Sequence, residues 1–160
     1  MSRILAVAAL AASLAAATLV PAASASQSMA ATGGFTLTAF NETFERYAGA
    51  PPPSNGNLFF AAHDLAAYTG TLTGTHVFDG TIEIFKDGSA TFHGTITFTG
   101  TVAGCGTGTV VLEVNGTGDA SGVITRDQEQ TLPGGTLPVH ARLDFAGQLP
   151  NLTYTGTYDC

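Results

Sequence analysis

Residues 90–102 read ATFHGTITFTGTV, and every second position of this stretch is apolar or glycine. Phe92, Ile96, Phe98 and Val102 fall on one face, while His93 and the threonines fall on the other. A period of two is the pattern of a β-strand with one buried and one solvated face. The stretch therefore predicts one strand of an antiparallel sheet that covers an apolar core.

The same alternation recurs through most of the chain. Turn signals separate the alternating runs, among them Asp87-Gly88, Asn115-Gly116 and Pro133-Gly134-Gly135. One short stretch, residues 61–68, is a weak helical candidate. We expect about eight strands, which cover residues 35–47, 58–62, 66–76, 81–86, 90–102, 110–114, 139–145 and 152–158.

Eight antiparallel strands can form either a sandwich or a closed barrel, and the glycines favour the barrel. Many of the 20 glycines lie inside the predicted strands, in phase with the apolar residues. Glycine weakens a flat strand, so its presence there indicates strong coiling or crowded interior packing. Closure also removes the unpaired edges of a sheet. We therefore predict an all-β fold, a single antiparallel and roughly eight-stranded closed barrel with little helix.

The first 25 residues have the features of a cleaved signal peptide. Arg3 precedes an apolar run over residues 4–20, and Ala23-Ser24-Ala25 is an A-x-A cleavage site. The alternative, a membrane anchor, would need a longer and more apolar run. We expect residues 26–160 to form one barrel domain with a flexible start at 26–33. The protein is then secreted through the general export route, with no integral membrane association after cleavage.

The chain has two cysteines, Cys105 and Cys160. An even pair in an exported protein predicts one disulfide, which here would tie the carboxyl end to the middle of the chain. The alternative is a reactive thiol pair, but neither cysteine has a C-x-x-C partner or an adjacent base.

Composition excludes several classes of function. Five basic against twelve acidic residues give a net charge of -7, so nucleic acid is not an expected partner. The four histidines have no metal-ligand spacing and are interpreted as surface imidazoles, so we expect neither metal nor cofactor. His63-Asp64 would be an acid/base pair only at a barrel mouth, and a loop dipeptide is the simpler interpretation.

Four segments carry a resemblance to a known family: 68–75 (YTGTLTGT), 87–94 (DGSATFHG), 98–104 (FTGTVAG) and 154–158 (YTGTY). In this spacing of glycine and threonine the chain resembles bacterial exported proteins of the allene oxide cyclase-like barrel family, over most of residues 34–158. The resemblance implies an eight-stranded barrel with a mostly apolar interior that binds and bends an apolar substrate. No catalytic residue of the plant enzymes matches a position in this chain.

Seven residues are candidates for a ligand site inside the barrel. Arg126 is placed inward by counting in twos from Gly122 through Ile124, although it could instead lie at the rim beside Asp127 or Glu129. The other six are aromatic residues in apolar phase, interleaved with glycines: Phe78, Phe92, Phe98, Phe145, Tyr154 and Tyr158.

These observations predict a barrel that binds a small apolar or amphipathic ligand. One alternative is a structural or interaction protein with a filled barrel that acts through its loops, because eight strands enclose a space that side chains can fill. Another is a cyclase or isomerase that acts by shape on an apolar substrate. The catalytic residues and the oligomeric state are not predicted, because no residue set in the sequence has the geometry of a mechanism.

Overall fold

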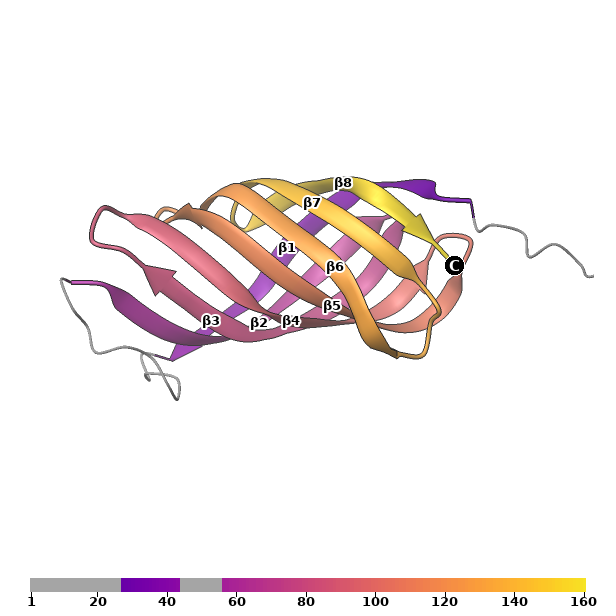
Figure 1. Ribbon diagram of the computed structural model, residues 1–160, viewed down its shortest axis with the longest axis horizontal. Helices are drawn as coiled ribbons and strands as arrows, with labels where there is room; N and C mark the ends of the chain where they lie inside the picture. The colour runs from indigo at the N-terminus through magenta and orange to yellow at the C-terminus, as the bar shows by residue number, and fades with distance from the viewer. Residues whose placement is uncertain (1–26, 44–55) are drawn as a thin grey trace, which may run out of the picture.

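The computed structural model describes residues 27–43 and 56–160, and it is a single closed β-barrel (Figure 1). Every strand is antiparallel to its neighbours along the chain, and the last strand pairs with the first. The predicted fold class is therefore confirmed. The strands are β1 (Met29–Thr43), β2 (Leu58–Gly70), β3 (Leu72–Ile84), β4 (Ser89–Val102), β5 (Gly106–Asp119), β6 (Val123–Gly135), β7 (His140–Gln148) and β8 (Asn151–Asp159).

The alternation in residues 90–102 positions β4 as the sequence predicted. Ile96, Phe98 and Val102 are buried, and the threonines between them are exposed. Across the sheet, Phe98 pairs with His76 of β3 and with Val110 of β5. Buried residues of adjacent strands therefore lie side by side and form one interior.

One expectation about the chain is wrong, that of a helix at residues 61–68. Residues 61–68 form part of β2, in register with β1 and β3, because Ala62, Ala66 and Tyr68 alternate inward at a period of two. From Met29 onward, the segment expected to be flexible belongs to β1, where Met29 pairs with Tyr158 of β8. Residues 1–25, the predicted signal peptide, lie outside the described residues.

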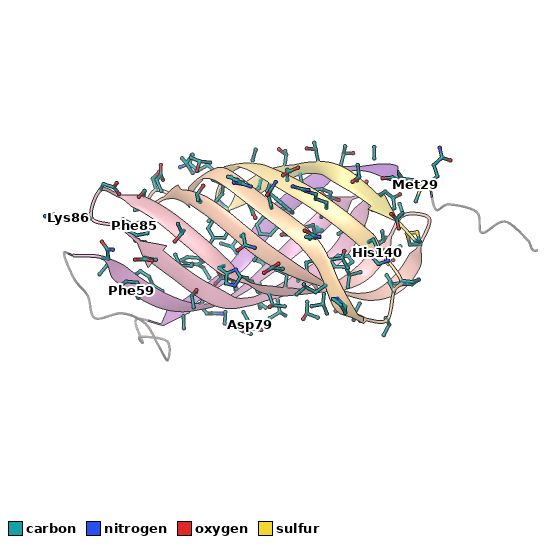
Figure 2. All side chains as sticks on the ribbon, in the orientation of Figure 1. Met29, Phe59, Asp79, Phe85, Lys86 and His140 are labelled. Carbon is teal, nitrogen blue, oxygen red and sulfur yellow. A yellow bond between two sulfur atoms is a disulfide. The ribbon has the colours of Figure 1, made fainter. Side chains whose placement is uncertain are left out.

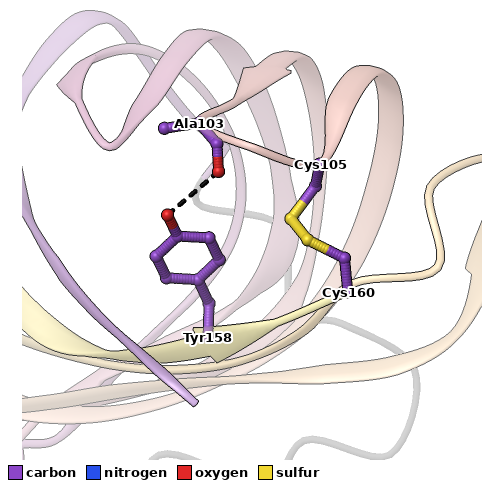
Figure 3. The surroundings of a disulfide bond; sticks show 4 residues. All are labelled: Ala103, Cys105, Tyr158 and Cys160. Carbon is purple, nitrogen blue, oxygen red and sulfur yellow. Dashed lines mark hydrogen bonds between the residues drawn. A yellow bond between two sulfur atoms is a disulfide. The ribbon is translucent and has the colours of Figure 1, made fainter. Parts of the chain in front are cut away.

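The two ends of the barrel differ. Phe85 and Lys86, between β3 and β4, lie at one end, and Met29 and His140 lie at the other (Figure 2). The second end carries the predicted disulfide, which is confirmed: Cys105 and Cys160 are bonded, with their Cα atoms 5.7 Å apart (Figure 3). A disulfide is consistent with an oxidising, extracellular or periplasmic location. Within the described residues, no helix has the length and apolar character needed to cross a bilayer.

Candidate functional site

The half of the barrel nearer the disulfide is filled by side chains. Tyr68 lies at the centre of an aromatic cluster, with ring centroids 5.6 Å from Phe98, 5.7 Å from Tyr154 and 6.0 Å from Phe145. The Tyr154 hydroxyl accepts the Leu72 backbone N–H at 2.8 Å, which anchors the ring to the start of β3. Such edge-on rings and anchored hydroxyls fill an interior densely.

The other half of the barrel is open. An inner chamber of about 100 Å³ lies on the side of the aromatic cluster that faces away from the disulfide. It meets a wider mouth of about 440 Å³ at the end of the barrel that carries Phe85 and Lys86. The walls that chamber and mouth share are apolar, so together they form a funnel into the barrel. Their shared lining residues are Leu37, Phe40, Ile82, Phe92, Ile124 and Leu149.

The glycines in the wall make room for aromatic rings. A Cβ on Gly94 would lie 2.5 Å from the Phe78 ring, and a Cβ on Gly116 would overlap the Phe92 ring. Both rings therefore lie against bare backbone and line the chamber. The spaces expected from the glycines are taken by these rings, and the chamber is the space that remains between them.

The chamber ends on a cluster of polar side chains that are almost fully buried. Asp64, His76, Asp127 and Glu129 line it and are 6%, 4%, 7% and 2% exposed, respectively. The Tyr68 hydroxyl lies 2.9 Å from both carboxyl oxygens of Glu129 and 3.2 Å from Nδ1 of His76. Because the hydroxyl carries one proton, it donates to one of these neighbours and accepts from the other. The three groups form one hydrogen-bonded chain.

Burial sets the protonation states of this cluster. Burial raises the pKa of Glu129 well above its usual value, and the neighbouring Asp127 charge raises it further. Burial, with the nearby Asp144 charge, raises the pKa of Asp127 to about 7. Burial lowers the pKa of His76 to about 4 and raises that of Tyr68 well above its usual value. At neutral pH, His76 is therefore neutral and Asp127 is near its titration midpoint, while burial favours the protonated form of Glu129.

A β-bulge explains why Asp127 and Glu129 point inward. The register of β6 shifts against β5 between Ile124 and Arg126, so the alternation changes phase there. Arg126 is consequently exposed, where its guanidinium donates to the Gln128 side chain at 2.7 Å. The expectation that Arg126 points into the barrel is wrong for this reason.

The aromatic candidates divide between the two halves of the barrel. Phe78 and Phe92 line the chamber, whereas Phe98, Phe145 and Tyr154 belong to the filled half. Tyr158 lies at the closed end, where its hydroxyl donates to the Ala103 carbonyl at 2.9 Å (Figure 3).

Sequence reasoning missed the polar cluster. His76 is buried, against the expectation of a surface imidazole, whereas His63, His93 and His140 are exposed as predicted. Asp64 lies in a strand and points inward, while its neighbour His63 points outward. The phase of His76 with Phe78, two residues apart in β3, was a signal for its burial. Across the part of the chain that the structure describes, no three His, Cys, Asp or Glu side chains are grouped to hold a metal ion.

Comparison with known proteins identifies the fold and leaves the family open. No model of a protein family matches the chain, and no curated protein matches it in sequence. Among solved structures, it is similar to a protein of unknown function from the DUF3224 family of Shewanella oneidensis MR-1. The TM-score is 0.65 at 16% identity, over 82% of this chain and 97% of that one. The likeness supports the β-barrel fold of this chain.

Proposed function

We propose that this protein is a secreted barrel that binds a small apolar or amphipathic molecule in its open half. The observation that carries the proposal is the apolar funnel that ends on the buried cluster of Tyr68, His76, Asp127 and Glu129. Ligand sites in proteins combine apolar walls with a few placed polar groups, and this half of the barrel has both.

Secretion is the second part of the proposal. It is supported by the A-x-A site at residues 23–25 and by the Cys105–Cys160 disulfide. The intact mass of protein recovered from the culture medium tests it: a chain that starts at Ser26 is expected, and a chain that starts at Met1 and stays with the cells would contradict it.

Thermal-shift screening against fatty acids, terpenoids and polyketides tests ligand binding. A ligand at a hundred times its dissociation constant adds about 2.7 kcal/mol to the free energy of unfolding. Val114 lines the chamber, so Val114→Phe is expected to abolish the shift. Val111→Phe, which adds the same ring on the outer face of β5, is the matched control. A shift that persists in Val114→Phe would place the ligand elsewhere.

Cyclisation or isomerisation of an apolar substrate is a second candidate, in line with the resemblance to allene oxide cyclase-like barrels. One observation favours it: Glu129 lines the chamber, and burial raises its pKa well above the usual value, which favours the protonated acid that can donate to a substrate oxygen. The test is conversion of bound apolar epoxides or enones to isomers of equal mass, which Glu129→Gln should slow at least tenfold. Equal rates in both proteins would contradict it.

The remaining alternative is an interaction protein that acts through its loops. The filled half of the barrel supports this alternative, because a packed interior is a stable core for loops that bind a partner. An open, apolar half has no role in such a protein. An absence of thermal shift across the whole ligand panel would favour this alternative.

A further inference from the structure

The described ionisable side chains that line the funnel include carboxyl groups but no lysine or arginine. Three carboxyl groups line the inner chamber, those of Asp64, Asp127 and Glu129, together with the imidazole of His76, which is neutral at neutral pH. The mouth adds Asp119. Among the described residues, neither lining contains a lysine or an arginine, and Lys86, Arg126 and Arg142 are exposed. This pattern attracts cations and repels anions.

Asp127 is the member of the cluster with an unmet bonding capacity. Glu129 is bonded to Tyr68, and Asp64 accepts the backbone N–H of Asn41 at 3.1 Å. Oδ1 of Asp127 has no hydrogen-bond partner among the residues that the structure describes, although the side chain is only 7% exposed. A buried acceptor without a donor is costly, so a donor supplied by a ligand would stabilise it.

We propose that the chamber binds the protonated amino group of an apolar primary amine, with the Asp127 carboxylate as its acceptor. This inference rests on the proposed function and narrows its ligand class. An ammonium group offers three donors and a full positive charge to a site of carboxyl oxygens. Folding has already removed Asp127 from water, so only the amine is desolvated on binding.

The alternatives fit the chamber less well. A fatty-acid carboxylate would add a second negative charge beside the Asp127 carboxylate, which raises the free energy of the complex. An alcohol can donate to Asp127, but without the charge that strengthens the hydrogen bond. The expected order of affinity is therefore amine first, alcohol second and carboxylate last.

Titration calorimetry with octylamine, octanol and octanoate at pH 8 tests this order, because the three probes share one alkyl chain. Octylamine is expected to bind roughly 10- to 100-fold more tightly than octanol, the range given by a charge-assisted hydrogen bond. In Asp127→Asn this preference should be lost, while octanol binding stays within about threefold. The control is Asp79→Asn, which removes the same charge from an exposed side chain on the outer face of β3.

A pH series on the wild type tests the inference without a substitution. Octylamine stays protonated from pH 8 to pH 5, whereas protonation of Asp127, with its pKa at about 7, should weaken octylamine binding roughly 10- to 90-fold at pH 5. Octanol binding should change far less. His76, with a pKa of about 4, remains neutral over this range. The titratable groups around Asp127 are Asp64 and Tyr68 on β2, His76 on β3, Glu129 on β6 and Asp144 on β7.

The outcomes separate the two proposals. If octanol binds as tightly as octylamine, or if Asp79→Asn loses the preference as fully as Asp127→Asn, the amine assignment is overturned and ligand binding stands. If none of the three probes binds the folded wild type, both proposals fail. If Asp127→Asn does not fold, the pH series decides, and an amine affinity that does not change between pH 8 and pH 5 overturns the assignment.

Discussion

The hydroxyl of Tyr68 lies 2.9 Å from both carboxyl oxygens of Glu129, and this contact joins β2 to β6 through the interior of the barrel. The two strands are not neighbours in the sheet, so the contact crosses the lumen. Phe98 and Tyr154 of the filled half lie on the side of this contact nearer the disulfide, and the open chamber lies on the other side. This pair marks the boundary between the two halves of the barrel.

Tyr68→Phe should reduce the free energy of unfolding by about 1–3 kcal/mol, because it leaves the buried Glu129 and His76 without their common partner. Urea unfolding at neutral pH measures the loss. Tyr158→Phe removes a hydroxyl at the closed end and leaves the lumen contact intact, so it serves as the comparison. A Tyr68→Phe variant as stable as the wild type would show that the lumen contact contributes nothing.

Asp127 should make the protein less stable as the pH rises. Its pKa is raised from 3.8 to about 7 on folding, so folding favours the protonated acid. The contribution of Asp127 to the free energy of unfolding is fully present below about pH 4. It is lost as the pH rises toward 7, a change on the order of 4 kcal/mol. Asp127→Asn should remove this slope, as measured by urea unfolding across the range. If Asp79→Asn removed the same pH dependence of stability, that dependence could not be assigned to the buried Asp127 carboxyl.

His76 should have the opposite dependence. Its pKa is lowered from 6.5 to about 4, so folding favours the neutral ring, and stability is lost as the pH falls from 6.5 to 4 by on the order of 3 kcal/mol. His76→Gln should remove this loss, whereas His93→Gln, on the exposed face of β4, should not. Because the slopes of Asp127 and His76 overlap and oppose each other, each must be measured as wild type minus variant.

The disulfide should contribute on the order of 4 kcal/mol to the free energy of unfolding, since it closes a loop of 55 residues in the unfolded chain. Urea unfolding of a Cys105→Ser, Cys160→Ser variant tests this value. The reduced wild type should unfold at the same urea concentration as the variant. A double variant with wild-type stability would show that the other contacts at this end of the barrel hold the terminus without it.

The fold could be predicted from the sequence because its main signal is local. In residues 90–102 the period of two assigns each side chain to a face without knowledge of its partners. The polar cluster could not be predicted in the same way. A bulge near Thr125 changes the phase of β6 and is defined by pairing with β5, so counting in twos placed Arg126 inside and Asp127 outside. Which half of the barrel stays open depends on how Phe78, Phe92 and Tyr68 pack across strands far apart in sequence.

The crystal structure of the wild type with octanol bound tests the central claim most directly, because it locates the ligand. We expect the hydroxyl beside Asp127 and Glu129 and the alkyl chain between Phe78 and Phe92, pointing toward the mouth. A chamber closed by movement of these rings, with octanol absent or held only on the outer wall of the barrel, would contradict the account.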